Sequence, residues 1–383
     1  MSKIQLGLLF AIGLVFWTIS NGMLPLLPVY SLQLGADVSF AGSFLSFSFL
    51  MLTISTILTG WLADKYQRRK AMFIAAGILY SLALALMSRA TDQWQFAVFT
   101  SLAWFLFGTG VALVNIFAGA SAGEGERGKI FGILALTGGF GLLMGGLLLG
   151  RIADAFGYPA LLLMLAALGL LWPILGIFVQ DEQLDLPPEE KAERAWGSID
   201  RGIWAFLGAF TLAWTGFFAG RLGTSFIMES LGFSSAAISS TSTAAGAITL
   251  PLPAIFGWLS DRTDRLRIIA FGFVFGALGL GMLVFASDLW QFWLVAILIT
   301  TMSAVIGVGF AHMVDAAPDD SVGMGLSLFQ STAWVAGIVG FLAAGYAIDN
   351  IGFAPSTFVA AVLPVIAIGV LAVSAKLLGR TGP

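Results

Sequence analysis

The sequence predicts an all-α membrane protein in which twelve transmembrane helices form two parallel repeats of six. The first observation is composition: 58% of the 383 residues are hydrophobic and only 10% are charged, whereas a soluble domain carries about 25% charged residues. The second is that charged residues divide the chain into twelve uncharged runs. The third is a charged hairpin at residues 60–70 that returns at residues 257–267, about half a chain length later.

Each uncharged run is long enough to cross a bilayer. None is shorter than 18 residues, and a spanning helix needs about 20 apolar residues. Barrel strands have only about 10 residues of alternating polarity, so helices fit better. We expect the first run to be a span and not a cleaved signal peptide, whose apolar core has about 7–15 residues. The runs are 4–36, 38–63, 71–88, 93–123, 130–150, 155–180, 202–220, 230–260, 268–287, 289–311, 321–348 and 350–375.

The distribution of Lys and Arg predicts the orientation in the membrane. An even number of spans places both termini on one side, and cytoplasmic loops carry an excess of Lys and Arg. With the amino terminus inside, 15 of the 18 Lys and Arg residues are cytoplasmic. Only Arg89, Arg151 and Arg221 fall outside or within a span. We therefore expect a multi-pass protein of the cell (inner) membrane with both termini in the cytoplasm.

Further matches extend the internal repeat through each half. Asp92-Gln93-Trp94-Gln95-Phe96 corresponds to residues 288–292, and the segment 150–157 corresponds to 345–352. Each half has six spans, so the second half enters the membrane from the same side as the first, and the repeats are parallel. The predicted domains are an N-terminal bundle at 1–180, a cytoplasmic linker at 181–201 and a C-terminal bundle at 202–383.

Composition also excludes several classes of protein. The chain has no Cys and a single His, which argues against a disulfide and against a metal centre. The net charge of -3 implies no nucleic-acid partner. No nucleophile–base pair, metal cluster or phosphate loop is present in the sequence. We expect no cofactor and no enzymatic activity.

The first hairpin resembles the loop between helices 2 and 3 of the major facilitator superfamily. The second hairpin resembles the second copy of this loop motif, which members of the family often carry in the second half of the chain. The residues that match the first loop are Gly60, Leu62, Asp64, Arg68 and Arg69, with Gln67 where the family usually has Gly. The segment 24–30 is similar to the end of helix 1 in the twelve-span drug-exporter branch. Trp104 stands where those exporters carry an Arg in helix 4, and the segment 145–150 lacks the Pro of their helix 5 signature.

The resemblance implies two six-helix bundles around a central cavity and a cytoplasmic latch formed by the hairpins. Breaking the latch would accompany the change to the inward-facing state. The alternative interpretation is a turn that only sets topology through its charged flanks. The latch residues implied are Gly60, Asp64, Arg68 and Arg69, with Gly257, Asp261 and Arg265 in the second hairpin.

Arg221 is an ionisable residue that interrupts the seventh predicted span, in the outer half of its helix. An ionisable group inside a span is expensive and is a functional candidate by default. It either pairs with Glu229 or another acid at the membrane rim, or it faces a water-filled cavity and binds an anionic substrate. Both interpretations remain open at this point.

Several uncharged residues are candidates for the wall of the substrate cavity. Trp17 and Trp214 lie 197 positions apart, at matching places in the two repeats. The resemblance implies that the helices carrying them line the cavity. Packing, lipid contact or hydrogen bonds between helices are the alternative roles. The candidates are Trp17, Asn21, Asn115, Trp214, Gln330 and Trp334.

Coupling to protons has few candidate residues. His312 can titrate near neutral pH, and Asp315, three residues later, can share its helix face. Glu229 is the third candidate, and a structural pair at the helix end is the alternative for His312 and Asp315. No acid lies in the middle of a span, so uniport, substrate exchange and coupling through residues at the helix ends stay open.

The expected function is transport by alternating access. Apolar and aromatic spans favour an amphiphilic, drug-like solute that is moved outward, and Arg221 would suit an anionic group on it. The alternatives are uptake or facilitated passage of a sugar or organic acid, and a lipid flippase or a membrane receptor that does not transport. The expected partners are the small-molecule substrate and the lipid bilayer, with protons as an open possibility, and we expect a monomer.

Overall fold

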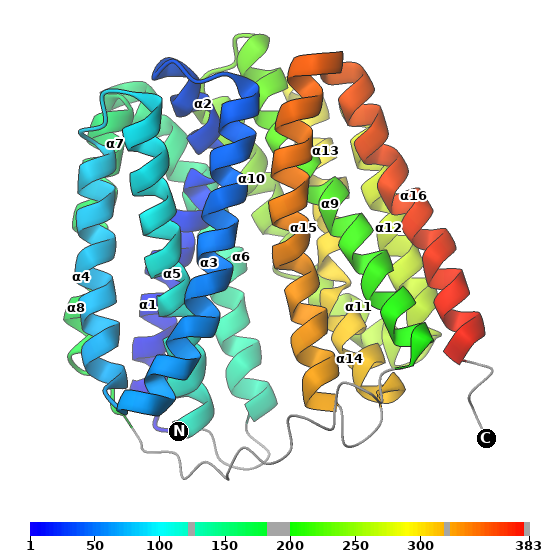
Figure 1. The fold of residues 1–383 in the computed structure, drawn as a ribbon, viewed down its shortest axis with the longest axis horizontal. Coiled ribbons are helices and arrows are strands. Elements are labelled where there is room, and N and C mark those ends of the chain that lie inside the picture. The colour runs from blue at the N-terminus through cyan, green and yellow to red at the C-terminus, as the bar shows by residue number, and fades with distance from the viewer. Residues whose placement is uncertain (122–126, 182–199, 318–321, 379–383) are drawn as a thin grey trace. The chain divides into compact units, whose positions relative to one another are not determined.

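The computed structural model describes residues 1–121, 127–181, 200–317 and 322–378, which are helical almost throughout and contain no strand. Figure 1 shows the helices, most of which run roughly parallel or antiparallel within each half of the chain. The helices of the first half are α1 (Lys3–Met23), α2 (Leu26–Gln33), α3 (Val38–Tyr66), α4 (Arg69–Met87), α5 (Gln93–Ser121), α6 (Arg127–Phe156), α7 (Tyr158–Gly169) and α8 (Leu171–Gly176). Those of the second half are α9 (Arg201–Ser230), α10 (Ser235–Thr249), α11 (Leu252–Ser260), α12 (Arg265–Leu283), α13 (Leu289–Ala304), α14 (Ile306–Ala316), α15 (Val322–Ile351) and α16 (Phe353–Leu378).

Twelve helical segments in the described part of the chain are long and apolar enough to cross a membrane. This number confirms the twelve spans expected from the uncharged runs. Three of the segments consist of two helices with a short break, namely α7 with α8, α10 with α11 and α13 with α14. The first uncharged run also holds two helices, because α1 ends at Met23 and α2 begins at Leu26.

Prolines explain three of these breaks. A proline ring clashes with the carbonyl group four residues earlier and offers no N–H to it. Pro28 lies four residues after Leu24, where α1 has just ended, and Pro173 lies four residues after Gly169, the last residue of α7. Pro253 has the same relation to Thr249, the last residue of α10. The helices therefore end where the sequence removes their hydrogen bonds.

The repeated Asp-x-Trp-Gln-Phe motif is a helix start. The Asp92 carboxylate accepts hydrogen bonds from the backbone N–H of Trp94 at 2.8 Å and of Gln95 at 3.0 Å, where α5 begins. Asp288 forms a capping box with Gln291 at the start of α13. Such caps contribute about 1 kcal/mol each. The two Trp side chains of the motif are 66% and 57% exposed, as expected for residues near the membrane interface.

The described chain forms two compact units. The first unit contains residues 1–185 together with 228–247, and the second contains 186–227 together with 248–383. The segment 228–247, which holds the end of α9 and most of α10, thus belongs to the first unit although it lies in the second half of the sequence. The predicted division into an N-terminal bundle at 1–180, a linker at 181–201 and a C-terminal bundle at 202–383 stays a prediction.

Aromatic packing fills the core of each unit. In the first unit the fully buried Trp172 has its ring centroid 5.8 Å from that of Phe16 and 5.4 Å from that of Phe73. In the second unit the buried Phe210 lies 4.7 Å from Phe329, ring to ring. Glycines let helices of the first unit approach closely, as at the crossing of α1 and α6. Close packing of this kind holds helices together where lipid is as apolar as the protein core.

Candidate functional site

The second charged hairpin is built at the junction of α11 and α12. Asp264 begins α12, because its carboxylate accepts the backbone N–H of Leu266 at 2.8 Å and that of Arg267 at 3.3 Å. This cap fixes the direction in which the next residue, Arg265, leaves the helix. A carboxylate at a helix start also interacts favourably with the helix dipole.

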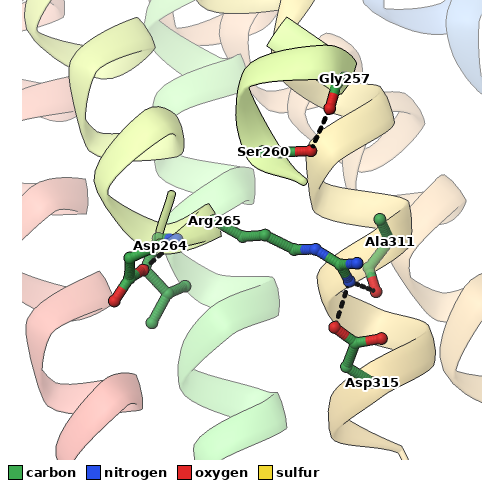
Figure 2. A network of polar contacts seen from close by, with 7 residues as sticks. Gly257, Ser260, Asp264, Arg265, Ala311 and Asp315 are labelled. Carbon is green, nitrogen blue, oxygen red and sulfur yellow. Dashed lines mark hydrogen bonds and ion pairs between the residues drawn. The ribbon is translucent and has the colours of Figure 1, made fainter. Parts of the chain in front are cut away.

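Arg265 ties α12 to α14. Its Nη1 donates to the carbonyl oxygen of Ala311 at 2.5 Å and to Oδ2 of Asp315. Figure 2 shows the arginine extended from the start of α12 across to these two acceptors. The Arg265 side chain is 25% exposed and that of Asp315 is 59% exposed, so water reaches the ion pair. This pair joins residues 50 positions apart in the sequence.

The two hairpins share a second contact that sequence analysis missed. In the first hairpin the Nζ of Lys65 lies 4.5 Å from the ring centroid of Trp61. In the second, the guanidinium carbon of Arg262 lies 4.0 Å from the ring centroid of Trp258. Both pairs are four residues apart and occupy matching repeat positions. The repeated Trp therefore holds a cation at the helix end, and the spacing of Trp to Lys or Arg was the signal that could have revealed it.

Other predicted latch residues have different surroundings. Arg69 is buried, with 1% of its surface exposed, while Arg68 and Asp261 are exposed. Gly60 and Gly257 are half-buried, and the side chain of Asp64 lies outside the described residues. Gln67 ends α3 in the left-handed conformation with φ 52°. A left-handed residue other than Gly costs about 1–2 kcal/mol, so the position favours the glycine that the resemblance leads one to expect.

Arg221 lies on α9 and is half-buried. Its guanidinium carbon is 5.8 Å from the ring centroid of Phe217. Among the described residues no ion pair joins it to Glu229 or to any other acid. Glu229 is eight residues further along the helix, about 12 Å by helical rise, which is too far for an ion pair within α9. The first of the two interpretations, pairing with Glu229 or another acid at the membrane rim, therefore has no support among the described residues.

Trp214 lies on the same face of α9 as Arg221, because seven residues make close to two helical turns. Its ring centroid is 5.0 Å from that of Phe217. The Trp214 Nε1 atom is buried and has no hydrogen-bond partner within the described part of the chain. A buried indole N–H without a hydrogen-bond partner destabilises the folded state by about 1–3 kcal/mol. This face of α9 therefore offers a guanidinium without an acid partner and an indole N–H without an acceptor among the residues that the structure describes.

The remaining cavity candidates divide between the two units. In the first unit, the Nδ2 of Asn21 donates to the carbonyl oxygen of Gly138 at 3.3 Å, and Trp17 packs edge-on against Phe107 at 5.1 Å. Asn115, in the same unit, is exposed. In the second unit, Gln330 and Trp334 are half-buried on α15. Asn21 therefore forms a hydrogen bond between α1 and α6, and the role of all these residues in a substrate cavity stays a prediction.

His312 and Asp315 face different partners. The His312 ring lies 4.8 Å from that of Phe206, centroid to centroid, and its Nε2 is buried without a hydrogen-bond partner among the described residues. Asp315 instead pairs with Arg265. Glu229 is half-buried near the end of α9. A role for these three residues in proton coupling stays a prediction. Within the described ranges no group of three or more His, Asp or Glu side chains gathers to hold a metal ion.

Comparison with known protein families identifies the superfamily of this chain. The sequence profile of the Major Facilitator Superfamily matches residues 8–225 and 205–382. The chain belongs to the Major Facilitator Superfamily. This finding confirms the resemblance inferred from the hairpins and the fold class inferred from the spans.

Individual members of the superfamily resemble the chain over part of its length. It is 29% identical to the multidrug resistance protein MdtG of Citrobacter koseri over 176 residues, which are 45% of this chain and 42% of the relative. It is 32% identical to the Staphyloferrin B transporter of Staphylococcus aureus over 186 residues, 47% of this chain and 43% of the relative. The matches span less than half of these relatives.

Solved structures of Major Facilitator Superfamily transporters share the fold over the whole chain. The POT family transporter PepTSo matches with a TM-score of 0.80 at 14% identity and covers 100% of this chain and 99% of its own. The nucleoside transporter NupG matches with a TM-score of 0.78 at 14% identity, covering 98% of this chain and 100% of its own. At these identities the likeness concerns the fold alone.

This superfamily member has a buried aromatic residue where the drug exporters carry an Arg. Trp104 is 8% exposed and packs against Phe49 at 5.0 Å and Phe107 at 5.7 Å, measured between ring centroids. Together with Ser20 and Tyr80 it lines a small, mainly apolar pocket inside the first unit. The position therefore contributes to packing and holds no charge.

The Arg265–Asp315 pair is expected to contribute little to stability. In a double-mutant cycle of Arg265→Ala and Asp315→Ala, the coupling free energy of unfolding should stay below about 1 kcal/mol because both side chains reach water. Arg265→Ala alone should cost about 1 kcal/mol more than Asp315→Ala, since it also removes the hydrogen bond to Ala311. Unfolding in mixed micelles with increasing denaturing detergent measures both quantities.

Asp261→Ala is the matched control for this cycle, because Asp261 is an exposed acid within the same hairpin. It should show no coupling with Arg265→Ala. A coupling above 2 kcal/mol between Arg265 and Asp315, or an equal coupling with Asp261, would contradict the expected result.

Proposed function

We propose that this protein is a secondary transporter that moves a small amphiphilic solute with an anionic group outward across the membrane by alternating access. Membership of the Major Facilitator Superfamily supports transport. The partial matches to a multidrug resistance protein and to a Staphyloferrin B transporter support export of a small molecule. The proposed orientation has both termini in the cytoplasm, as the distribution of Lys and Arg predicts.

The proposal that the substrate has an anionic group rests on the face of α9 that presents Trp214 and Arg221. A charged group inside a span costs about 2.5–3.5 kcal/mol at the helix centre. The contact with Phe217 contributes only about 0.5–2 kcal/mol of cation–π attraction, and no acid among the described residues offsets the rest. A carboxylate on the substrate would offset that cost, because ionised acceptors form the stronger hydrogen bonds with guanidinium.

Hydrogen bonding also supports an acceptor on the solute. The Nε1 of Trp214, without a partner among the described residues, lies about two helical turns from Arg221. A solute with an anionic head and an aromatic or aliphatic body could engage the guanidinium at one end and the aromatic side chains at the other. Uptake of a sugar or organic acid is the second candidate function; it would be favoured by a cavity rich in amides and acids.

Ligand-induced thermal stabilisation of the purified protein tests the proposal. The probes are an alkyl carboxylate, an alkyl alcohol and an alkyl ammonium of one chain length. A ligand at about 100 times its Kd stabilises the folded state by about 2.7 kcal/mol. We expect the carboxylate to raise the unfolding temperature of the wild type, and Arg221→Ala to abolish that shift.

Arg89→Ala is the matched control, because Arg89 is an exposed arginine at the end of α4. It should respond to the carboxylate as the wild type does. If the alcohol or the ammonium compound stabilises equally well, or if Arg221→Ala keeps the full response, Arg221 does not bind the anionic group and the substrate class is wrong.

A further inference from the structure

The pocket beside Trp104, inside the first unit, has three hydroxyl groups in its otherwise mainly apolar wall. The hydroxyls belong to Ser20 on α1, Tyr80 on α4 and Thr100 on α5. All three residues are buried, so the water around the protein does not solvate them. Buried polar groups are nearly always hydrogen-bonded, and each of these hydroxyls therefore needs a partner inside the bundle.

Thr100 lacks such a partner in the protein. Its residue is fully buried, and its Oγ1 has no hydrogen-bond partner among the described residues. A Thr within a helix can donate to the carbonyl oxygen four residues earlier, and Thr211 and Thr215 do so at 2.9 and 2.8 Å. A buried hydroxyl without a partner destabilises the folded state. Because Thr100 lines the pocket, a partner held in the pocket would remove this cost.

The hydroxyls of Ser20 and Tyr80 can also bond a further group. Their oxygen atoms lie 3.3 Å apart, which is beyond the 2.5–3.0 Å usual for an O–H···O hydrogen bond. A hydroxyl can donate one hydrogen bond and accept two, so this single long contact leaves capacity on both groups. Together with Thr100, three polar groups on three helices line one pocket.

The size of the pocket limits what it can hold. It offers about 10 Å³ to the centre of a water molecule, which is about the room that one buried water requires. Buried waters make about three hydrogen bonds to otherwise unsatisfied polar groups, and the pocket provides three hydroxyls. The rest of the wall is apolar and includes Met23, Leu84 and Met87. Size and polarity therefore both match a single water molecule.

We propose that this pocket is a binding site for one ordered water molecule, which joins α1, α4 and α5 through the hydroxyls of Ser20, Tyr80 and Thr100. The water accepts from the Thr100 hydroxyl and donates to the oxygen atoms of Ser20 and Tyr80. Such a bridge is nearly as favourable as a direct hydrogen bond. The site lies within the first unit, whereas Arg221 belongs to the second, so it does not depend on the proposed function.

Hydroxyl-radical labelling of the purified wild-type protein tests the site directly. Short X-ray pulses convert bound water into hydroxyl radicals, which oxidise a neighbouring Met to its sulfoxide. Met87 is buried and lines the pocket, while Met302 is buried beside Gly276 and is not among the residues of the pocket. We expect Met87 to be oxidised more than Met302. Equal oxidation of the two residues would overturn the proposal, and this measurement needs no variant to fold.

Thr100→Val keeps the shape of the side chain and removes its hydroxyl. It should reduce the oxidation of Met87 toward that of Met302. It should also raise the ratio of unfolded to folded protein in mixed micelles about twofold to tenfold, as the loss of one hydrogen bond does. If no water binds, the variant removes an unsatisfied buried group and lowers that ratio. A lower ratio, or oxidation of Met87 at the wild-type level, would overturn the proposal.

Thr109→Val is the matched control on the same helix. The Thr109 hydroxyl has protein partners, because it donates to the carbonyl oxygen of Phe105 at 3.3 Å and accepts from Thr59 Oγ1 at 3.2 Å. Thr109 is not among the residues of the pocket. Its substitution should leave the oxidation of Met87 unchanged. An equal decrease in both variants would show that the labelling does not report a water held by Thr100, and the proposal would be wrong.

Discussion

Trp172→Ala is expected to lower the free energy of unfolding by about 3–5 kcal/mol, the range for removing a large aromatic side chain from a packed core. Trp172 is fully buried in the first unit. It contacts Phe16, Phe73 and Tyr80 with ring centroids 5.4–5.8 Å away. Its Nε1 has no hydrogen-bond partner within the described residues, so the expected loss comes from packing alone.

Unfolding of the purified protein in mixed micelles measures this loss. Trp94→Ala is the control, because the Trp94 side chain is 66% exposed at the start of α5. That variant should lose less than about 1 kcal/mol, as is usual for surface substitutions. If the two variants lost equal free energy of unfolding, burial of a Trp in the first unit would not determine how much it contributes to stability.

Gly22→Leu is expected to destabilise the protein by about 3 kcal/mol, the upper end of the usual range for an overpacked core. A Cβ atom at Gly22 would lie 2.6 Å from the Cα of Gly145, and the reverse substitution meets the same obstacle. This nearest atom belongs to the backbone of α6 and cannot turn aside as a flexible side chain could. The helices α1 and α6 would have to separate along this crossing.

Gly7→Leu provides the comparison on the same helix, because a Cβ at Gly7 meets no heavy atom within 4 Å. It should change the midpoint of the unfolding transition little. If Gly22→Leu unfolds at the same denaturant concentration as Gly7→Leu, α1 and α6 do not cross at Gly22 and Gly145.

The class of protein could be predicted from the sequence because the bilayer imposes simple requirements. A span must be apolar for about 20 residues, so charged residues mark the ends of the spans in the amino-acid sequence. The twelve spans were predicted on this basis, and the superfamily was predicted from the hairpin residues together with the spans; both are confirmed. The charged hairpins at residues 60–70 and 257–267 could be found because their residues follow one another in the chain. The matching Lys65–Trp61 and Arg262–Trp258 contacts are local for the same reason.

The partners of the candidate residues were not predictable in this way. Arg265 is paired with Asp315, and Asp154 with the start of α10, across 50 and about 80 positions. Such pairs depend on the rotation and depth of each helix. Hydrophobic periodicity reports rotation in a soluble protein, but lipid is as apolar as the protein core, so both faces of a span look alike in the sequence.

The sequence by itself thus determined the number of spans, the repeat and the superfamily, since each depends on where charges and local motifs fall along the chain. Only the tertiary structure decided that Trp172 is buried while Trp94 is exposed, and that Asn21 bonds to a neighbouring helix. It also decided that Arg221 lies beside Phe217 without an acid among the described residues. The physical reason is that contacts between spans are selected by close packing of backbone and side chains, which composition and spacing do not record.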